Sequence, residues 1–148
     1  MREVDTQEYV SMLKDLVEEG HQVSLLISGS SMAPFLIHRR DTVYFKKPDR
    51  ALKEGDIVFY RRANGRYVMH RIRWIRQDGY YMIGDGQTQT EGPLKREQIF
   101  GLITAVKRKD KLIRPGDFWW EFFARVWLRI IPLRGLIRRL YTVIMSRK

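Results

Sequence analysis

The chain reads Ser28-Gly29-Ser30-Ser31-Met32-Ala33-Pro34 where a short apolar segment ends, and Val68-Met69-His70-Arg71-Ile72 further along. The first stretch places a hydroxyl directly before a Met-x-Pro turn, and the second places a histidine inside an apolar strand. Serine is a weak nucleophile at neutral pH until a neighbouring base takes its proton. The two stretches therefore contain the residue types of a nucleophile–base pair, and a fold is expected that brings them together.

The segments around these two stretches predict a mainly β chain. Short apolar runs indicate strands over residues 23–27, 42–45, 57–61, 66–75, 80–83 and 99–107. Asn64-Gly65 and Asp78-Gly79 are typical of tight hairpins, because both supply residues that tolerate positive φ. We expect a partly open antiparallel β-barrel of coiled strands.

Helices are expected at both ends of this β unit. Apolar residues recur at helical spacing over 7–19, with Thr6 as N-cap and Gly20 just past the end. A helical turn over 32–36 is expected after the serine run, and its N–H groups would point at an acyl oxygen. A polar loop over 84–93 carries two acids, Asp85 and Glu91.

The serine stretch resembles the nucleophile box of the signal-peptidase and LexA-type serine peptidases (the S24/S26 superfamily), in which the reactive serine directly precedes Met-x-Pro. This resemblance points to Ser31. Most branches place a lysine base on the later strand, whereas the branch of the endoplasmic reticulum, archaea and some Gram-positive bacteria places histidine and arginine there, as in His70-Arg71. No lysine occurs between Lys53 and Lys95. The run Ile83-Gly84-Asp85-Gly86 and the strand at 98–103 resemble the third box and the return strand of the same family.

The resemblance implies a serine endopeptidase that cleaves a leader or signal-type peptide, bound as an extended strand with small side chains before the cut. Ser31 would be the nucleophile and His70 the base. The backbone N–H of Ser31 would hold the oxyanion, with the hydroxyls of Ser30 or Ser28 as helpers, because Gly29 stands where the family often has serine.

The third catalytic member is left open between Asp85 and Glu91. The family usually has Gly-Asp-Asn, but Gly86 follows Asp85 here, and Glu91 stands where the histidine branch tends to have aspartate. A structural alternative for Asp85 is a pair with Arg71 that fixes the loop. His70 shares a strand face with Val68 and Ile72, and burial in such a setting lowers a histidine's pKa, so that it stays neutral and able to accept a proton.

Composition limits the remaining possibilities. A chain of 148 residues has room for one domain with a modest core. It has no cysteine, which fits a reducing cytoplasm, and its three histidines lack metal-ligand spacing. We therefore expect that the protein needs neither a cofactor nor a metal. We also expect it to be cytoplasmic. The N-terminus is charged and no apolar run of signal-peptide or transmembrane length is present.

The net charge of +11 is concentrated at the C-terminal end, where the residues from Lys107 to Lys148 include twelve basic and three acidic side chains. The divisions expected are an N-terminal helix over 1–22, a peptidase-like β domain over 23–107 and a basic, aromatic-rich helical tail over 108–148. Pro132 would separate two helical pieces of this tail.

The tail predicts a peripheral contact with an anionic membrane surface. The residues expected to make it are Trp119, Trp120, Phe123, Arg125, Trp127 and Arg129. Packing of the same aromatics on the barrel, or on a protein partner, is the alternative. Nucleic acid is disfavoured because neither a helix-turn-helix nor an aromatic-basic β platform is present. The oligomeric state is left open.

Two other functions stand beside the peptidase. One is a catalytically silent relative that acts as a membrane- or partner-binding module. The other is a LexA-like self-cleaving repressor, which is disfavoured because only a short segment precedes the first strand and no lysine base is available.

Overall fold

The computed structural model describes residues 6–27, 32, 35–37, 39–87, 89–108 and 110–130. Their elements are, in chain order, α1 (Thr6–Glu18), β1 (Val23–Leu26), β2 (Asp41–Lys46), β3 (Ile57–Arg61), β4 (Tyr67–Arg76), β5 (Gly79–Ile83), β6 (Glu91–Leu94), η1 (Arg96–Gln98), β7 (Ile99–Arg108), β8 (Lys111–Ile113), α2 (Phe118–Glu121), η2 (Phe122–Val126) and η3 (Trp127–Ile130). The expected second piece of the tail, over 133–145, lies outside the described residues.

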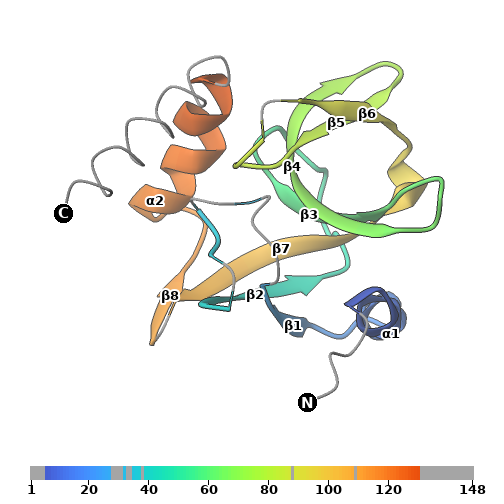
Figure 1. Cartoon of the computed structure of the whole chain (residues 1–148), viewed down its shortest axis with the longest axis horizontal. Coiled ribbons are helices and arrows are strands. Elements are labelled where there is room, and N and C mark those ends of the chain that lie inside the picture. The colour runs from blue at the N-terminus through green and yellow to red at the C-terminus, as the bar shows by residue number, and fades with distance from the viewer. Residues whose placement is uncertain are drawn as a thin grey trace, which may run out of the picture.

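The strands form one antiparallel sheet in the order β1-β2-β7-β3-β4-β5-β6, with β8 paired to the C-terminal half of β7. The sheet curls so that β3 to β6 surround an interior, while β1, β2 and β8 extend to one side (Figure 1). The mainly antiparallel, open β architecture with helical segments at both ends confirms the expected fold class. The strand β8 was not expected, and β6 begins at Glu91, inside the segment expected to be loop.

Helix α1 ends as the sequence predicts. The N–H of Gly20 donates to the carbonyl of Val17, and the N–H of His21 donates to that of Leu16. This pair of hydrogen bonds at the end of the helix needs a residue with a left-handed backbone conformation, and Gly20 supplies it with a φ of 99°. The first turn of the helix is attached to β4, because the amide of Gln7 bonds both the N–H and the carbonyl of Tyr67.

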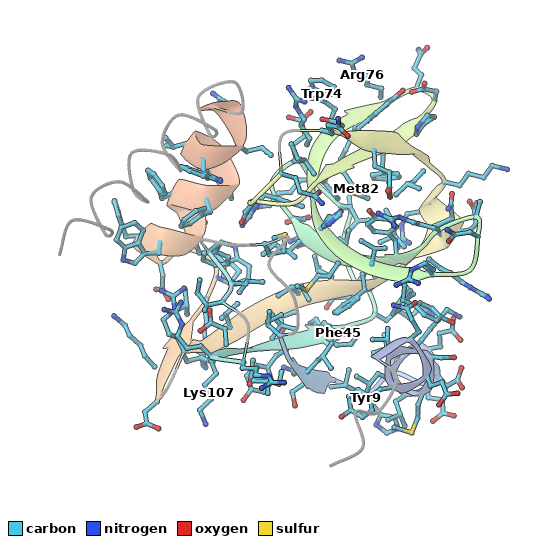
Figure 2. The ribbon with its side chains drawn as sticks, viewed as in Figure 1. Tyr9, Phe45, Trp74, Arg76, Met82 and Lys107 are labelled. Carbon is cyan, nitrogen blue, oxygen red and sulfur yellow. The ribbon has the colours of Figure 1, made fainter. Side chains whose placement is uncertain are left out.

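Two large apolar cores account for most of the buried apolar side chains among the described residues. One lies between α1, the β1-β2-β7 region and the C-terminal helical segment, and the other lies inside the curl of β3 to β6. Phe45 belongs to the first core and Met82 to the second (Figure 2). Strand β4 separates them, since Met69 packs toward the first core and Ile72 toward the second. Residues of β4 are therefore covered on both faces.

The C-terminal helical segment, α2 with η2 and η3, packs on the β domain. Trp120, Phe123 and Trp127 are buried in the first core, with the ring of Phe35 5.8 Å from Trp120 and 5.0 Å from Phe123. These three aromatics were expected at a membrane surface, and that expectation is wrong for them, because burial against the barrel removes them from solvent. Trp119, Arg125 and Arg129 remain exposed.

The turn before β3 fits closely against this segment. Gly55 has φ of 95°, and a Cβ built there would lie 2.9 Å from the carbonyl oxygen of Ala124. Any larger residue would have to displace the segment, so only glycine meets both the conformation and the space. The C-terminal segment is thus part of the folded unit and not a separate appendage.

Candidate active site

The predicted nucleophile and its helpers, Ser28, Ser30 and Ser31, lie outside the described residues. The chain on both sides of them is anchored. Ile27, which follows β1, donates its N–H to Asp41 and accepts a hydrogen bond from the N–H of Arg39. Met32 is buried and its carbonyl accepts the N–H of Leu36. The expected helical turn over 32–36 includes Ala33 and Pro34, which lie outside the described residues.

His70 lies in the middle of β4, opposite Val58 of β3, and only 4% of it is exposed. Burial lowers the pKa of His70 to about 4, although the nearby carboxylate of Glu91 opposes this shift. The imidazole is therefore neutral at pH 7, as the sequence predicts, and can accept a proton.

The hydroxyl of Tyr60 lies 3.1 Å from Nδ1 of His70. The same hydroxyl donates to Oε1 of Glu91 at 2.7 Å. Glu91 thus connects to the histidine through a phenol. Burial raises the pKa of Tyr60, and the hydrogen bond to Glu91 raises it further, so that the phenol keeps its proton at pH 7.

Arg62 holds Glu91 from its other side. The Nε of this arginine donates to both carboxylate oxygens, at 3.0 and 2.8 Å. Partial burial pulls the pKa of Glu91 upward, but the hydrogen bonds from Arg62 and Tyr60 outweigh burial, and the pKa lies below its usual value. Glu91 is consequently a carboxylate at neutral pH.

Asp85 occupies a different environment. Its two oxygens accept hydrogen bonds of 2.8 Å from Nε and Nη2 of Arg71, and both side chains are fully buried. Arg71 also donates to the carbonyl of Gly55, and Nε1 of Trp127 donates to the carbonyl of Asp85. This arrangement is the structural alternative that the sequence left open for Asp85, since it joins the Gly84–Gln87 turn to β4 and to the C-terminal segment.

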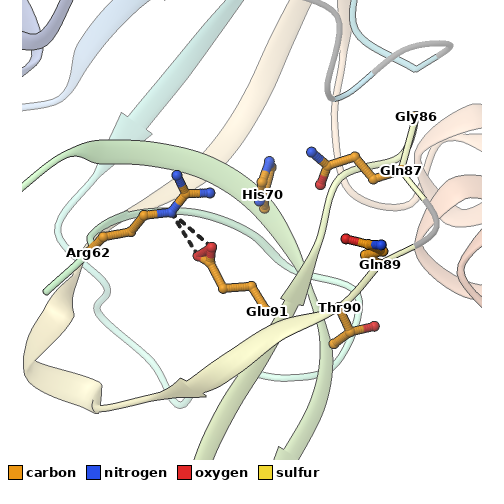
Figure 3. Close-up of a pocket in the computed structure, with 7 residues that line it drawn as sticks. All are labelled: Arg62, His70, Gly86, Gln87, Gln89, Thr90 and Glu91. Carbon is orange, nitrogen blue, oxygen red and sulfur yellow. Dashed lines mark hydrogen bonds and ion pairs between the residues drawn. The ribbon is translucent and has the colours of Figure 1, made fainter. Parts of the chain in front are cut away.

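Two adjoining cavities open at His70. One, of about 410 Å³, is lined by Arg62, His70, Gly86, Gln87, Gln89, Thr90 and Glu91 (Figure 3). The other, of about 320 Å³, shares Arg62, His70 and Gln87 with it and continues along Leu25, Leu26 and Ile27 of the β1 region. In Figure 3 the amide of Gln87 points toward the imidazole from the opposite wall. The cavities thus form a groove from the histidine to the segment that leads into the serine run.

Sequence reasoning missed Tyr60 and Arg62. The signal was present in the hairpin, because the Asn64-Gly65 turn pairs Tyr60 with Val68 and Val58 with His70. Diagonal neighbours on one face of an antiparallel pair lie about 7–8 Å apart, which an aromatic side chain can span. Working out this register would have placed the phenol beside the imidazole.

The arrangement can perform proton transfer: a neutral, oriented imidazole faces a groove, and an ionised carboxylate stands behind it. An open antiparallel sheet that carries such a group is compatible with the S24/S26 superfamily of serine-peptidase-type domains, and the match of a family profile supports that superfamily. The chain belongs to the peptidase S24-like family, whose sequence profile matches residues 1–104. No curated protein and no solved structure matches it. Within the part of the chain that the structure describes, helices long and apolar enough to cross a bilayer are absent.

Proposed function

We propose that this protein is a serine endopeptidase of the histidine-type signal-peptidase branch, and that it cleaves a leader or signal-type peptide. The observation that carries the proposal is the groove at His70. It joins a neutral, oriented imidazole to the strand that leads into Ser31.

In the proposed reaction the lone pair of Nε2 on His70 takes the proton of the Ser31 hydroxyl as the oxygen attacks the peptide carbonyl. The backbone N–H of Ser31 stabilises the oxyanion, with Ser30 or Ser28 as helper. His70 then returns the proton to the leaving amine, and water hydrolyses the ester. A general base of this kind contributes about 10²–10⁴ in rate.

The substrate is proposed to bind as an extended strand. Among the described strands β1 pairs with β2 alone, so its other edge faces the groove lined by Leu25, Leu26 and Ile27. An edge strand offers free backbone donors and acceptors to an added strand. Small side chains are proposed next to the cut, as the family resemblance implies.

The test combines a serine-directed acylating probe with a peptide library that carries small residues before the cut. Ser31→Ala and His70→Gln are each expected to abolish labelling and cleavage while the melting temperature changes little. Ser11→Ala, on α1, and His21→Gln, on the surface, are the matched controls and should behave like the wild type.

The alternative is a catalytically silent relative that binds a membrane or partner through the exposed part of the C-terminal segment. Phe118, Trp119 and Val126 expose 70%, 51% and 48% of their surface there, beside the basic Arg125 and Arg129. A wild-type protein that takes no label and cuts no peptide, but binds anionic vesicles, would establish this alternative.

A further inference from the structure

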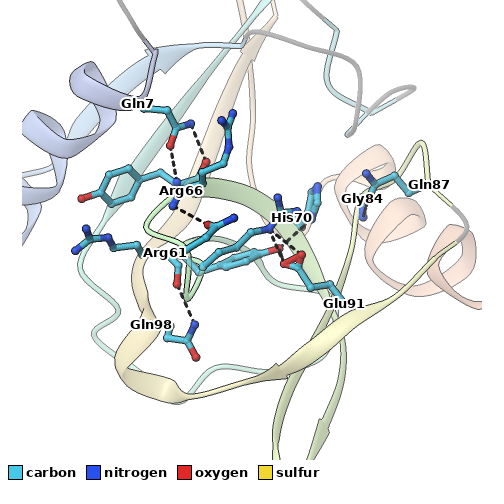
Figure 4. A network of polar contacts seen from close by, with 12 residues as sticks. Gln7, Arg61, Arg66, His70, Gly84, Gln87, Glu91 and Gln98 are labelled. Carbon is cyan, nitrogen blue, oxygen red and sulfur yellow. Dashed lines mark hydrogen bonds and ion pairs between the residues drawn. The ribbon is translucent and has the colours of Figure 1, made fainter.

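Tyr60 is a buried residue between the two candidate catalytic groups, and its single proton decides how they connect. It lies on β3 with none of its surface exposed, 3.1 Å from Nδ1 of His70 and 2.7 Å from Oε1 of Glu91. Figure 4 shows this network around His70 and Glu91, next to the contacts of Gln7 and Gln98. A buried hydroxyl with two partners can donate to only one of them.

The direction of the two hydrogen bonds follows from the charge on Glu91. An ionised carboxylate can only accept, and Arg62 keeps Glu91 ionised by donating to both of its oxygens. The proton of Tyr60 must therefore point to Glu91. The phenol oxygen is left as an acceptor, to which Arg62 also donates. Because the phenol proton is used by Glu91, the 3.1 Å contact with the imidazole is a hydrogen bond only if Nδ1 carries the proton.

We propose that Tyr60 is a positioning residue that holds neutral His70 in the Nδ1–H tautomer, with Glu91 setting the direction of its hydroxyl. Nε2 then carries the lone pair and faces the groove. This inference rests on the proposed function in one respect: a lone pair on Nε2 is what proton transfer from Ser31 requires. The neutral tautomer itself does not depend on whether the protein cleaves peptides.

The same chain of contacts stabilises the imidazolium that forms during catalysis. When His70 takes a proton at Nε2, the positive charge is shared with Nδ1–H, which donates more strongly to the phenol oxygen. The phenol in turn donates to an anionic carboxylate, and polarised chains of this kind strengthen one another. Glu91 therefore acts on the histidine through Tyr60, and Asp85, bound to Arg71, does not share this function.

The first test is ¹⁵N–¹H NMR of the histidine side chains in the full chain at pH 7, with His70→Gln used to assign the resonances. In the wild type, Nδ1 of His70 should be of the protonated type and Nε2 of the unprotonated type. Tyr60→Phe removes the acceptor that the described residues offer to Nδ1–H, so the tautomer should shift toward Nε2–H. Tyr67→Phe loses a hydroxyl that bonds Ser11 and is the matched control, with an unchanged spectrum for His70.

Glu91→Gln is the second variant, and it keeps the phenol. Arg62 can only donate, so it should select the oxygen of the new side-chain amide and leave the NH₂ group facing Tyr60. The phenol would then accept from this NH₂ group and donate to Nδ1, which moves the ring proton of His70 to Nε2. An Nε2–H tautomer in the wild type, or an Nδ1–H tautomer that persists in either variant, would overturn the proposal.

Kinetics separate this inference from the proposed function. If the protein is a peptidase, Tyr60→Phe should lower kcat about tenfold or more with KM unchanged, because only part of the histidine then has the correct tautomer. A wild type without activity defeats the peptidase proposal but leaves the NMR result for Tyr60 standing. If the wild type is active but the tautomer of His70 is the same in Tyr60→Phe, the inference about Tyr60 is wrong and the proposed function still stands.

Discussion

The guanidinium of Arg71 and the carboxylate of Asp85 meet in two parallel hydrogen bonds of 2.8 Å, with neither side chain exposed. The pair joins β4 to the turn after β5, and both residues make further hydrogen bonds. Arg71 donates to the carbonyl of Gly55, and the carbonyl of Asp85 accepts a hydrogen bond from Nε1 of Trp127. The ion pair and these two hydrogen bonds thus connect four segments of the chain.

Asp85→Asn is expected to destabilise the protein by about 3–5 kcal/mol, because breaking a buried pair leaves the other charge uncompensated. Urea unfolding followed by circular dichroism measures this change. Asp49→Asn is the matched control, since the exposed pair of Asp49 with Lys46 should contribute little. If Asp85→Asn keeps the unfolding midpoint but abolishes acylation by the probe, Asp85 is a catalytic residue and not the structural one described above.

The stability of the protein is expected to fall between pH 7 and pH 5 because of His70. Its pKa is about 4 in the folded protein and about 6.5 in an unfolded chain, so the unfolded chain binds more protons in this range and stability decreases as the pH falls. The expected loss between pH 7 and pH 5 is about 2 kcal/mol, because the unfolded chain takes up its proton near pH 6.5 whereas the folded protein stays almost unprotonated at this site down to pH 5.

Denaturant unfolding at pH 7, 6 and 5 checks this expectation, with His70→Gln showing a much flatter dependence than the wild type. His21→Gln removes an exposed histidine and should keep the wild-type slope. An equal slope in wild type and His70→Gln would mean that His70 is not buried as a neutral group. The measurement stops at pH 5, because Glu91, whose pKa lies below its usual value, loses its own stabilising contribution at lower pH.

Trp127 is expected to be necessary for the stability of the β domain. Trp127→Phe keeps most of the packing but loses the hydrogen bond to the carbonyl of Asp85, at a cost of about 1 kcal/mol. Trp127→Ala should cost about 3–5 kcal/mol, because it also leaves a cavity in the core. Differential scanning calorimetry gives both values. Trp119→Ala, at the exposed face of the same segment, should leave the transition almost unchanged, and a loss as large as that of Trp127→Ala would contradict the described packing.

Contact with an anionic membrane, if it occurs, is expected at Phe118 and Trp119. The double substitution Phe118→Ser and Trp119→Ser should weaken binding to anionic vesicles about tenfold or more, since burying one aromatic side chain contributes about 1.5–3 kcal/mol. Vesicle co-sedimentation measures the binding, and Met12→Ser, an exposed apolar residue on α1, is the control. Wild-type-like binding by the double variant would exclude this face. Removal of residues 117–148 is not a suitable test, because it also deletes part of the core.

Local sequence features were sufficient for most of the strands. The Asn64-Gly65 and Asp78-Gly79 turns each restrict the backbone where they stand, and the structure has hairpins at both. The apolar setting of His70 was likewise readable from the alternation of β4. The sequence did not indicate that both faces of β4 are covered, and so it left open whether Asp85 pairs with Arg71 or serves the histidine.

The C-terminal aromatics show where pattern reading fails. A helical stripe of large apolar side chains fits a lipid surface and a protein core equally well, because both environments remove the same surface from water. Only the position of Phe35 and of the Gly55 turn decides that Trp120 and Phe123 face inward. The exposed Phe118 and Trp119 belong to the same stripe and could not be separated from them in advance.

The sequence by itself determined the class of fold, the family and the presence of a histidine in an apolar strand, because turns, alternation and short motifs are local properties. Only the tertiary structure decided which hydrogen-bond partners Asp85 and Glu91 have. Asp85 and Glu91 lie close together in the chain, but the curl of the sheet turns Asp85 to Arg71 and brings Glu91 to Arg62 and Tyr60. Contacts between side chains of different strands depend on the register of the strands and on the direction of each side chain, and both are set only when the sheet curls around its core.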